Sequence, residues 1–367
     1  MIFARAAVAL PFLRHNKAGT IMHMRRLLVM VSAALTSVAA CGREEPGKGP
    51  PPAREVVVYT ALDRAFSEPI LDAFSRQTGI KVLAQYDVES TKTVGLANRI
   101  RAERDRPRCD VFWNNEILNT LALKAEDLLA PCHPSEAANY DEAWKDSQGY
   151  WYGFAARARV LLVHTELVPD ASFPSSIRDL ADPQWKGRTG IAKPLFGTTA
   201  SHIACLFAAL GPVKATQYLD SLKANDVRIY GGNKGCAEAV AAGHVAFALT
   251  DTDDAIIEVE RGRPVRIVYP DSGADGMGTL FLPNTLAVIR GAPHPAEAAQ
   301  LVNYLLSAEV EQKLAAGPSA QIPLNRKAAL NPRIRRPGEV KAMVVNLAVA
   351  ARSFPKACRV VEQRFLQ

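Results

Sequence analysis

The stretch Val245-Ala246-Phe247-Ala248-Leu249-Thr250-Asp251-Thr252-Asp253-Asp254 joins an apolar run to an acidic turn. Its first five residues have the length of a buried strand, and three acids then follow within four positions. In open α/β sheets, ligands bind just beyond the carboxyl ends of strands. Neighbouring carboxylates repel one another, so this turn requires a cation or hydrogen-bond donors from elsewhere in the chain. A solvated turn in which Asp254 caps the next helix is the alternative.

Strands and helices alternate on both sides of this stretch, which is typical of an α/β fold with parallel sheets. Apolar strands are predicted at 56–59, 80–83, 110–113, 160–163, 190–192 and 227–230. Helices are predicted from a cap at Ser67, from a cap at Ser90 or Thr91, from 197 to a stop at Gly211-Pro212, and over 295–314. The loops that follow the strands place Asp63, Asn115 and Glu116 at one sheet edge.

Residues 1–40 are similar to a bacterial lipoprotein signal peptide. Met24-Arg25-Arg26 supplies positive charge, 27–35 is an apolar run too short to span a bilayer comfortably, and small residues precede Cys41. We expect cleavage before Cys41, a lipid on its thiol, and a flexible tether over 41–54. The mature chain would then be periplasmic and anchored to a membrane. An ordinary secretory signal with a chance cysteine is the alternative.

The composition argues against nucleic-acid binding and against most enzymes. The formal net charge is +7, but five basic residues and no acid lie before residue 41, which leaves +2 for the rest. The motifs GxSxG, GK[ST] and HExxH are absent, and the seven His residues lack metal-ligand spacing. We therefore do not expect an enzyme. A hydrolase that uses a carboxylate-held metal ion is the alternative.

Two predicted helix starts offer donors for an anion. Gly197-Thr198-Thr199 combines free N–H groups, the positive end of a helix dipole and two hydroxyls. Asn233, which follows two glycines, offers a second site of this kind. Arg157 and Arg159 would point the same way along a strand, so one guanidinium can hold a carboxylate or a phosphate. Plain helix caps and surface ion pairs are the alternatives.

Five cysteines follow Cys41, and no CxxC motif occurs. Export permits disulfides, so Cys109 with Cys132 and Cys205 with Cys236 are candidate pairs, which would leave Cys358 single. Buried free thiols are the alternative.

Several short segments together point to one family. They are Val58-Tyr59, 74–82, Asp110-Val111-Phe112, Arg157-Ala158-Arg159-Val160, Trp185-Lys186-Gly187, Gly317-Pro318 and Pro323-Leu324-Asn325. From about residue 55 to residue 325, the chain resembles the periplasmic solute-binding proteins of ABC importers, in the branch that includes ferric-iron-binding proteins. This resemblance implies a type II fold with two α/β lobes, a hinge between them and a ligand in the cleft.

The resemblance also implies lobe boundaries and partners. We expect 55–157 with 283–325 to form one lobe and 158–282 with 326–367 to form the other. The chain would be a monomer that works with a membrane permease and an ATPase and binds no nucleic acid.

The ligand set departs from that of the ferric binders, which offer a histidine, a glutamate and two adjacent tyrosines. By place in the chain, the matching positions hold Asp63, Asn115 with Glu116 beside it, and Asp253-Asp254. The anion pocket of the family falls on Gly197-Thr198-Thr199 and Asn233, with Arg157 as a helper. No covalent cofactor is expected apart from the lipid on Cys41.

Two ligands fit these residues. One is a hard metal ion, iron-like and accompanied by a synergistic anion, with Asp63, Glu116, Asp253 and Asp254 as metal ligands. The other is a small zwitterion such as an aminoalkyl-phosphonate, whose ammonium would lie on Asp251, Asp253 or Asp254.

Overall fold

Ten strands form one mixed sheet in the computed structural model, which describes residues 54–87, 94–329 and 331–366. Neighbouring strands follow the order β2 (Lys81–Tyr86), β1 (Glu55–Thr60), β3 (Val111–Asn114), β10 (Phe281–Ile289), β5 (Tyr152–His164), β8 (Phe247–Asp251), β6 (Thr189–Ala192) and β7 (Arg228–Tyr230). In addition, β4 (Leu129–Ala130) pairs with β10, and β9 (Val265–Val268) pairs with β5. Every strand predicted from the apolar runs overlaps one of these.

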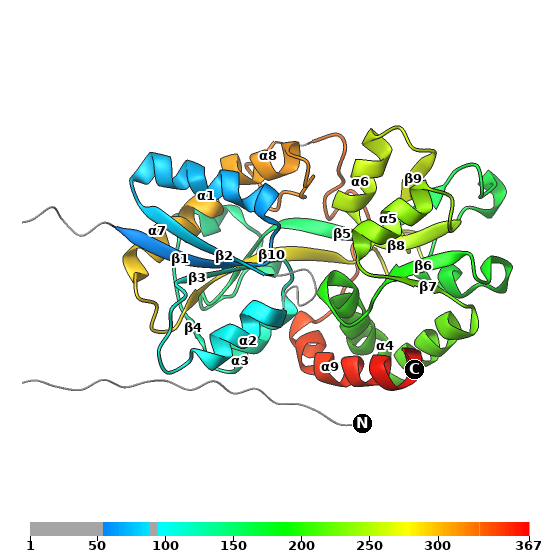
Figure 1. Ribbon diagram of the computed structural model, residues 1–367, viewed down its shortest axis with the longest axis horizontal. Coiled ribbons are helices and arrows are strands. Elements are labelled where there is room, and N and C mark those ends of the chain that lie inside the picture. Colours follow the sequence, from blue (N-terminus) through cyan, green and yellow to red (C-terminus); the bar gives the residue numbers. More distant parts are fainter. Residues whose placement is uncertain (1–53, 88–93, 330, 367) are drawn as a thin grey trace, which may run out of the picture. The chain divides into compact units, whose positions relative to one another are not determined.

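The sheet has two parallel parts joined by two antiparallel strands. In one part β1 is parallel to β2 and β3, and in the other β6 is parallel to β7 and β8. Between them, β5 pairs antiparallel with β10 over its first residues and with β8 from Arg159 onward, so a single strand runs through both parts (Figure 1). All of β5 is buried.

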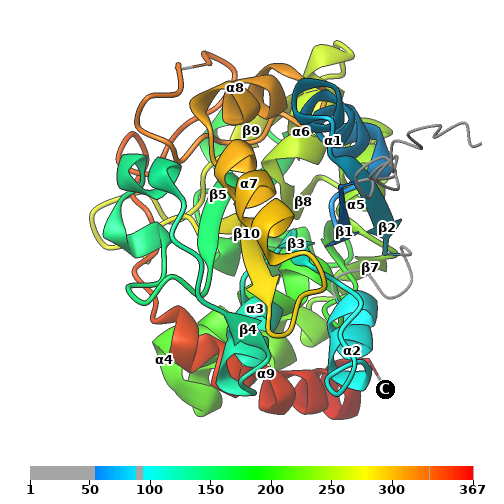
Figure 2. The same ribbon diagram turned by 90° about the vertical axis from the view of Figure 1, so that its left-hand side faces the viewer.

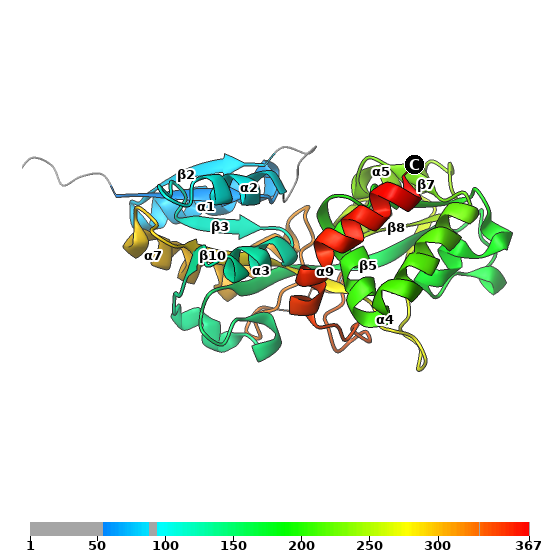
Figure 3. The same cartoon turned by 90° about the horizontal axis from the view of Figure 1, so that it is seen from below.

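Nine helices within the described ranges cover the two faces of this sheet. They are α1 (Arg64–Thr78), α2 (Val94–Ala102), α3 (Leu118–Ala125), α4 (Gly197–Ala224), α5 (Asn233–Ala241), α6 (Thr252–Glu260), α7 (Pro295–Leu305), α8 (Ala308–Ala316) and α9 (Leu347–Val360). One core cluster contains residues of α1, α5, α6, α7 and α8, and the other contains residues of α2, α3, α4 and α9. Figures 1 and 2 show α1, α6 and α8 on one side of the strands and α2, α4 and α9 on the other, and Figure 3 shows α9 beside α4.

Strand periodicity decides which side chains enter which core. On β1, Val58 belongs to one cluster and Tyr59 to the other, as expected for residues that alternate across a sheet. On β8, Phe247 and Leu249 face the cluster that contains α4, so Asp251, two residues further, points toward the same side.

One predicted helix boundary is wrong and another is confirmed. Ser67 does not cap α1, which begins at Arg64; its hydroxyl donates to the carbonyl oxygens of Leu62 and Asp63. As predicted, the helix from Gly197 stops at Gly211, where α4 is kinked, and a second helical segment follows and continues to Ala224. Gly211 takes φ 79° and ψ 160°, and the proline that follows has the φ angle that suits the first turn of a new helix.

The long helix predicted over 295–314 is two helices. The break falls at Leu306-Ser307, because the Ser307 hydroxyl accepts the Val310 N–H and caps α8. Such a cap ends one helical pattern and starts another without interrupting the apolar face.

Replacing Ser307 with alanine is expected to lower the free energy of unfolding by about 1 kcal/mol, since the first turn of α8 loses its side-chain acceptor. Urea unfolding measures the change. Ser307→Gly is the matched variant and should lose only a few tenths of a kcal/mol. No loss of stability in Ser307→Ala would show that the hydroxyl does not act as a cap.

Neither predicted disulfide is present, and all five cysteines in the described part of the chain are free thiols. The sheet separates each candidate pair. Cys109 and Cys205 belong to the core cluster that contains α4, whereas Cys236 belongs to the other cluster and Cys132 packs against it. Burial raises the pKa of Cys205 to about 12, so this thiol is protonated and unreactive at neutral pH.

The predicted signal peptide over 1–40, Cys41 and the tether up to residue 53 lie outside the described residues, as do Ser90 and Thr91. In the part of the chain that the structure does describe, no helix has the length and apolar character needed to cross a bilayer.

Candidate functional site

A cavity of about 790 Å³ is lined by residues from both parts of the sheet. From the β1–β3 part it is lined by Leu62, Asp63, Phe66 and Asn115; β5 contributes Arg157, and the rest of the lining comes from α4, α5, α6 and the ends of β6, β7 and β8. Ten of the eleven predicted ligand-binding residues line it, namely Asp63, Asn115, Arg157, Gly197, Thr198, Thr199, Asn233, Asp251, Asp253 and Asp254. The volume lies in the range of small-ligand sites.

The acidic turn reaches the cavity because β8 ends there. Asp251 is the last residue of β8, and Asp253 and Asp254 lie in the first turn of α6. A helix N-terminus stabilises carboxylates in its first turn. The Thr252 hydroxyl accepts the Ala158 N–H at 3.1 Å and so fixes this turn against β5.

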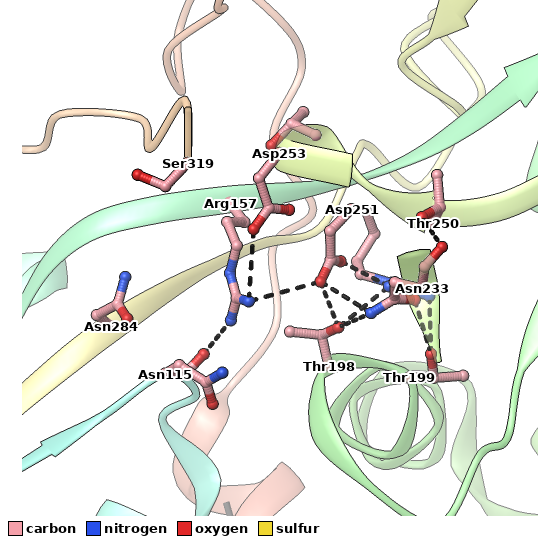
Figure 4. A network of polar contacts seen from close by, with 12 residues as sticks. Asn115, Arg157, Thr198, Thr199, Asn233, Thr250, Asp251, Asp253, Asn284 and Ser319 are labelled. Atoms are coloured by element: carbon pink, nitrogen blue, oxygen red, sulfur yellow. Dashed lines mark hydrogen bonds and ion pairs between the residues drawn. The ribbon is translucent and has the colours of Figure 1, made fainter. Parts of the chain in front are cut away.

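Asp251 lies at the centre of a buried polar network. Its Oδ1 accepts a hydrogen bond from the Arg159 guanidinium at 2.6 Å. Its Oδ2 accepts from the Thr198 hydroxyl at 2.6 Å and from the Asn233 amide at 3.0 Å (Figure 4). The strand register places Asp251 directly opposite Arg159. Burial by itself would raise the pKa of Asp251, but Arg159, Arg157 and the Thr198 hydroxyl hold it below its ordinary value.

Arg159, rather than Arg157, serves the Gly-Thr-Thr turn. Its guanidinium also donates to Thr198 Oγ1 at 3.1 Å, to Thr199 Oγ1 at 3.1 Å and to Asn233 Oδ1 at 2.9 Å. Arg157 lines the same cavity, and its role as a helper of the anion pocket stays a prediction. The expectation that both arginines point the same way is confirmed, since both approach Asp251. At the turn, Gly197 takes φ 56°, a left-handed conformation that favours glycine.

Arg157 connects the two parts of the sheet. It donates to the carbonyl oxygen of Asn115, in the loop after β3, while its Nη1 lies 3.7 Å from Asp251 and 3.9 Å from Asp253 (Figure 4). Burial would lower the pKa of Arg157, but the carboxylates of Asp251, Asp253, Asp254 and Asp63 together raise it above its ordinary value. Four of the predicted acids therefore act electrostatically on one guanidinium.

Glu116 is the predicted site residue that the structure does not place in the cavity. Its carboxylate is 1% exposed and accepts the Leu118 and Asn119 N–H groups at the start of α3. Its other donors are the side-chain amides of Asn114 and Asn119 and the hydroxyl of Ser201. Because five donors already bind it, Glu116 holds α3 against α4 and does not join the predicted metal ligands.

The remaining carboxylates share the cavity without forming a metal centre. No group of three or more His, Cys, Asp or Glu side chains in the described ranges is close enough to hold a metal ion. Among the residues that the structure describes, no tyrosine and no histidine lines the cavity. The ligand contacts of Asp63, Asp253 and Asp254 stay predictions.

Further charged residues of the lining were not predicted. They are Lys193, Lys234, Glu238, Glu258 and Arg261. Lys193 directly follows β6, so the rule that selected Asp63 after β1 would also have selected it. The others lie on helices or, in the case of Arg261, directly after one, where sequence alone does not show which face turns to the cavity.

The family of the chain follows from comparison with known proteins. A model described as "Bacterial extracellular solute-binding protein" matches residues 119–343, more than half of the chain. The chain belongs to this family. The iron-bound structure of HitA from Pseudomonas aeruginosa is 27% identical, covers 84% of this chain and 99% of its own, and superposes with a TM-score of 0.76. The predicted type II fold with two α/β lobes is thereby confirmed.

Relatives of this family differ in what they bind. The "Major ferric iron-binding protein" of Neisseria meningitidis is 27% identical over 75% of this chain and 82% of its own length. A "Putative 2-aminoethylphosphonate-binding periplasmic protein" of Salmonella typhi is 26% identical over 69% of this chain and 72% of its own. The relatives of the chain therefore include proteins named for each of the two predicted ligand classes.

Proposed function

We propose that this protein is the solute-binding lipoprotein of an ABC importer, exported to the periplasm and anchored through a lipid on Cys41. It captures ferric iron or another hard metal ion as cargo between its lobes and delivers it to a permease and an ATPase, with no chemical step. The observation that carries the proposal is that Asp63, from one part of the sheet, lines the same cavity as Asp253 and Asp254 from the other.

The lobes are proposed as 55–157 with 283–325 and 158–282 with 326–367. Support comes from β5, whose pairing changes from β10 at Ala158 to β8 at Arg159. Bending at this point would move Asp63 relative to Asp253 and Asp254, so closure can complete a ligand set that the described conformation does not assemble. Binding energy then shifts an equilibrium between open and closed states.

The charge of the cavity favours a cation. Its lining contains six acidic side chains and four basic ones. Carboxylate oxygens are the ligands that hard metal ions prefer. Proteins named as ferric-iron binders among the relatives support iron as the cargo.

Replacing both Asp253 and Asp254 with asparagine is expected to abolish the rise in Tm that ferric iron produces in the wild-type protein. The cargo would lose two carboxylate ligands, whereas the shape of the turn is kept. The measurement is a thermal-shift titration with ferric nitrilotriacetate, because a ligand that binds only the folded state raises Tm. Glu309→Gln, an exposed carboxylate on α8, is the matched control and should keep the full shift.

The same titration tests the proposal against its rivals. If iron and other metal ions leave the wild-type Tm unchanged, the metal proposal is wrong. If 2-aminoethylphosphonate alone raises it, the protein is a zwitterion binder. This second candidate is favoured by two exposed lysines on the cavity wall, Lys193 and Lys234. Hydrolysis of a phosphate ester that disappears in the Asp253/Asp254 variant would instead support the hydrolase.

A further inference from the structure

The hydrogen-bond donors around Asp251 form an anion-binding site. The anion that occupies this site is the Asp251 carboxylate itself. A hydroxyl from Thr198 at the start of α4, an amide from Asn233 at the start of α5 and the Arg159 guanidinium converge on one carboxylate, at 2.6, 3.0 and 2.6 Å. Hydroxyls and guanidinium groups beside helix N-termini are what proteins use to bind phosphate and other oxyanions. Here both oxygens of Asp251 receive these donors (Figure 4).

Burial makes this arrangement fixed. Asp251 and Arg159 are each 1% exposed and Thr198 is 3% exposed. A second anion at these donors would have to lie beside the Asp251 carboxylate in a site from which water is largely excluded, where repulsion between like charges is strong. The donors are therefore committed to the carboxylate.

We infer that Asp251 is a built-in anion, which fills the anion subsite of the cavity and lets the protein take its cargo without a free phosphate or carbonate. The consequence for the cargo rests on the proposed function, whereas the occupancy of the subsite does not. The synergistic anion predicted from the sequence is replaced by a side chain. A phosphonate ligand would likewise have to use Lys193 and Lys234 in place of Thr198 and Asn233.

Charge balance supports the same conclusion. Asp251 neutralises Arg159, and the second guanidinium, that of Arg157, lies among Asp251, Asp253, Asp254 and Asp63. Neither arginine then has positive charge to offer a free anion. Negative charge therefore remains on the acidic side chains that face the ligand, and a cationic cargo requires such charge.

The test is chemical rescue of an Asp251→Ala variant. Removing the side chain leaves Arg159 without its counter-ion and opens space among the donors. We expect Tm of this variant to be lower than that of the wild type and to rise with the concentration of formate, acetate or inorganic phosphate. Chloride at equal ionic strength should have a smaller effect, and the wild-type Tm should not respond to these anions.

Asp251→Asn is the matched control, because an asparagine fills the space without supplying charge, so anions should rescue it less than Asp251→Ala. Asp251→Ser is the second variant if the alanine variant does not fold. Calorimetric binding of inorganic phosphate that persists when Lys193 and Lys234 are both replaced with alanine would overturn the inference whatever the Asp251 variants do. A rescue that is equal in the alanine and asparagine variants would also overturn it.

Measurements of iron binding distinguish a failure of this inference from a failure of the proposed function. In buffer free of phosphate and carbonate, the wild-type protein should bind iron as tightly as it does when these anions are added. If the protein binds no iron but the alanine variant is rescued, the proposed function is wrong and the built-in anion stands. If iron binding requires an added anion, the inference is wrong and the proposed function stands.

Discussion

Replacing Arg159 with methionine is expected to lower the free energy of unfolding by about 3–5 kcal/mol, the typical cost of removing one partner of a buried ion pair. Methionine keeps an unbranched chain but removes the charge and all donors. Asp251 would then stay buried without its counter-ion, and Thr198, Thr199 and Asn233 would each lose a hydrogen bond. Urea unfolding at neutral pH, followed by circular dichroism, measures the loss.

Two comparisons show whether the charge pair is responsible. Arg266→Met removes a half-exposed partner of Asp170 and should cost at most about 1 kcal/mol. The double variant Arg159→Met with Asp251→Asn should be more stable than the sum of the two single losses predicts, because it removes both charges at once. Strictly additive losses would contradict a direct interaction between the two side chains.

The fold could be predicted because its signals are local. Each parallel strand is an apolar run followed by a polar loop, and each such loop lies at the same edge of a sheet, as with Asp63 after β1 and Asp251 at the end of β8. Sequence periodicity thus indicated which residues lie near the cavity. It did not indicate which of them contact one another.

Partners across the sheet depend on strand register, which sequence does not give. Arg159 and Asp251 are far apart in the chain and meet only because β5 and β8 pair with these residues opposite each other. The sequence therefore did not show that Asp251, one of the predicted acids, lies among the predicted anion donors. This placement removes the free anion from the inferred ligand, although ten of the eleven predicted residues line the cavity.

Glu116 shows a second limit of the same kind. A carboxylate after a strand and just before a helix can turn to the ligand or back to the N–H groups of that helix, and both suit its position. The structure shows the second, with Leu118 and Asn119 as donors. The cysteine pairs were wrong for a related reason, because the spacing of Cys205 and Cys236 does not reveal that the sheet lies between their cores.

Glu311 on α8 is a charged residue that the sequence did not single out. It is fully buried and accepts the N–H groups of Ala155 and Asn325 at 2.5 Å and that of Leu324 at 3.0 Å. Ala155 takes φ 43°, a strained conformation for a residue other than glycine, just before β5 passes from one part of the sheet to the other. The Glu311 carboxylate therefore fixes β5 where the proposed hinge begins.

Titration of Glu311 is expected to make stability depend on pH. Burial is the main cause that raises the pKa of Glu311, to about 7, while its backbone donors and the charge of Arg336 limit the rise. The folded protein therefore holds this proton more tightly than the unfolded chain does. The stability that this bound proton contributes is fully present below the pKa of Glu311 in the unfolded chain, near 4.5. It is lost as pH rises through the folded pKa of about 7.

Comparison with Glu311→Gln isolates this effect, because glutamine is neutral at every pH. The free energy of unfolding of the wild type minus that of the variant should fall by about 3 kcal/mol between pH 5 and pH 8, as each pKa unit corresponds to about 1.4 kcal/mol. Urea unfolding at a series of pH values measures it, with Glu309→Gln on the same helix as the exposed control that should show little change. A difference that stays constant or grows with pH would mean that the carboxylate is ionised throughout, held by its backbone donors despite its burial.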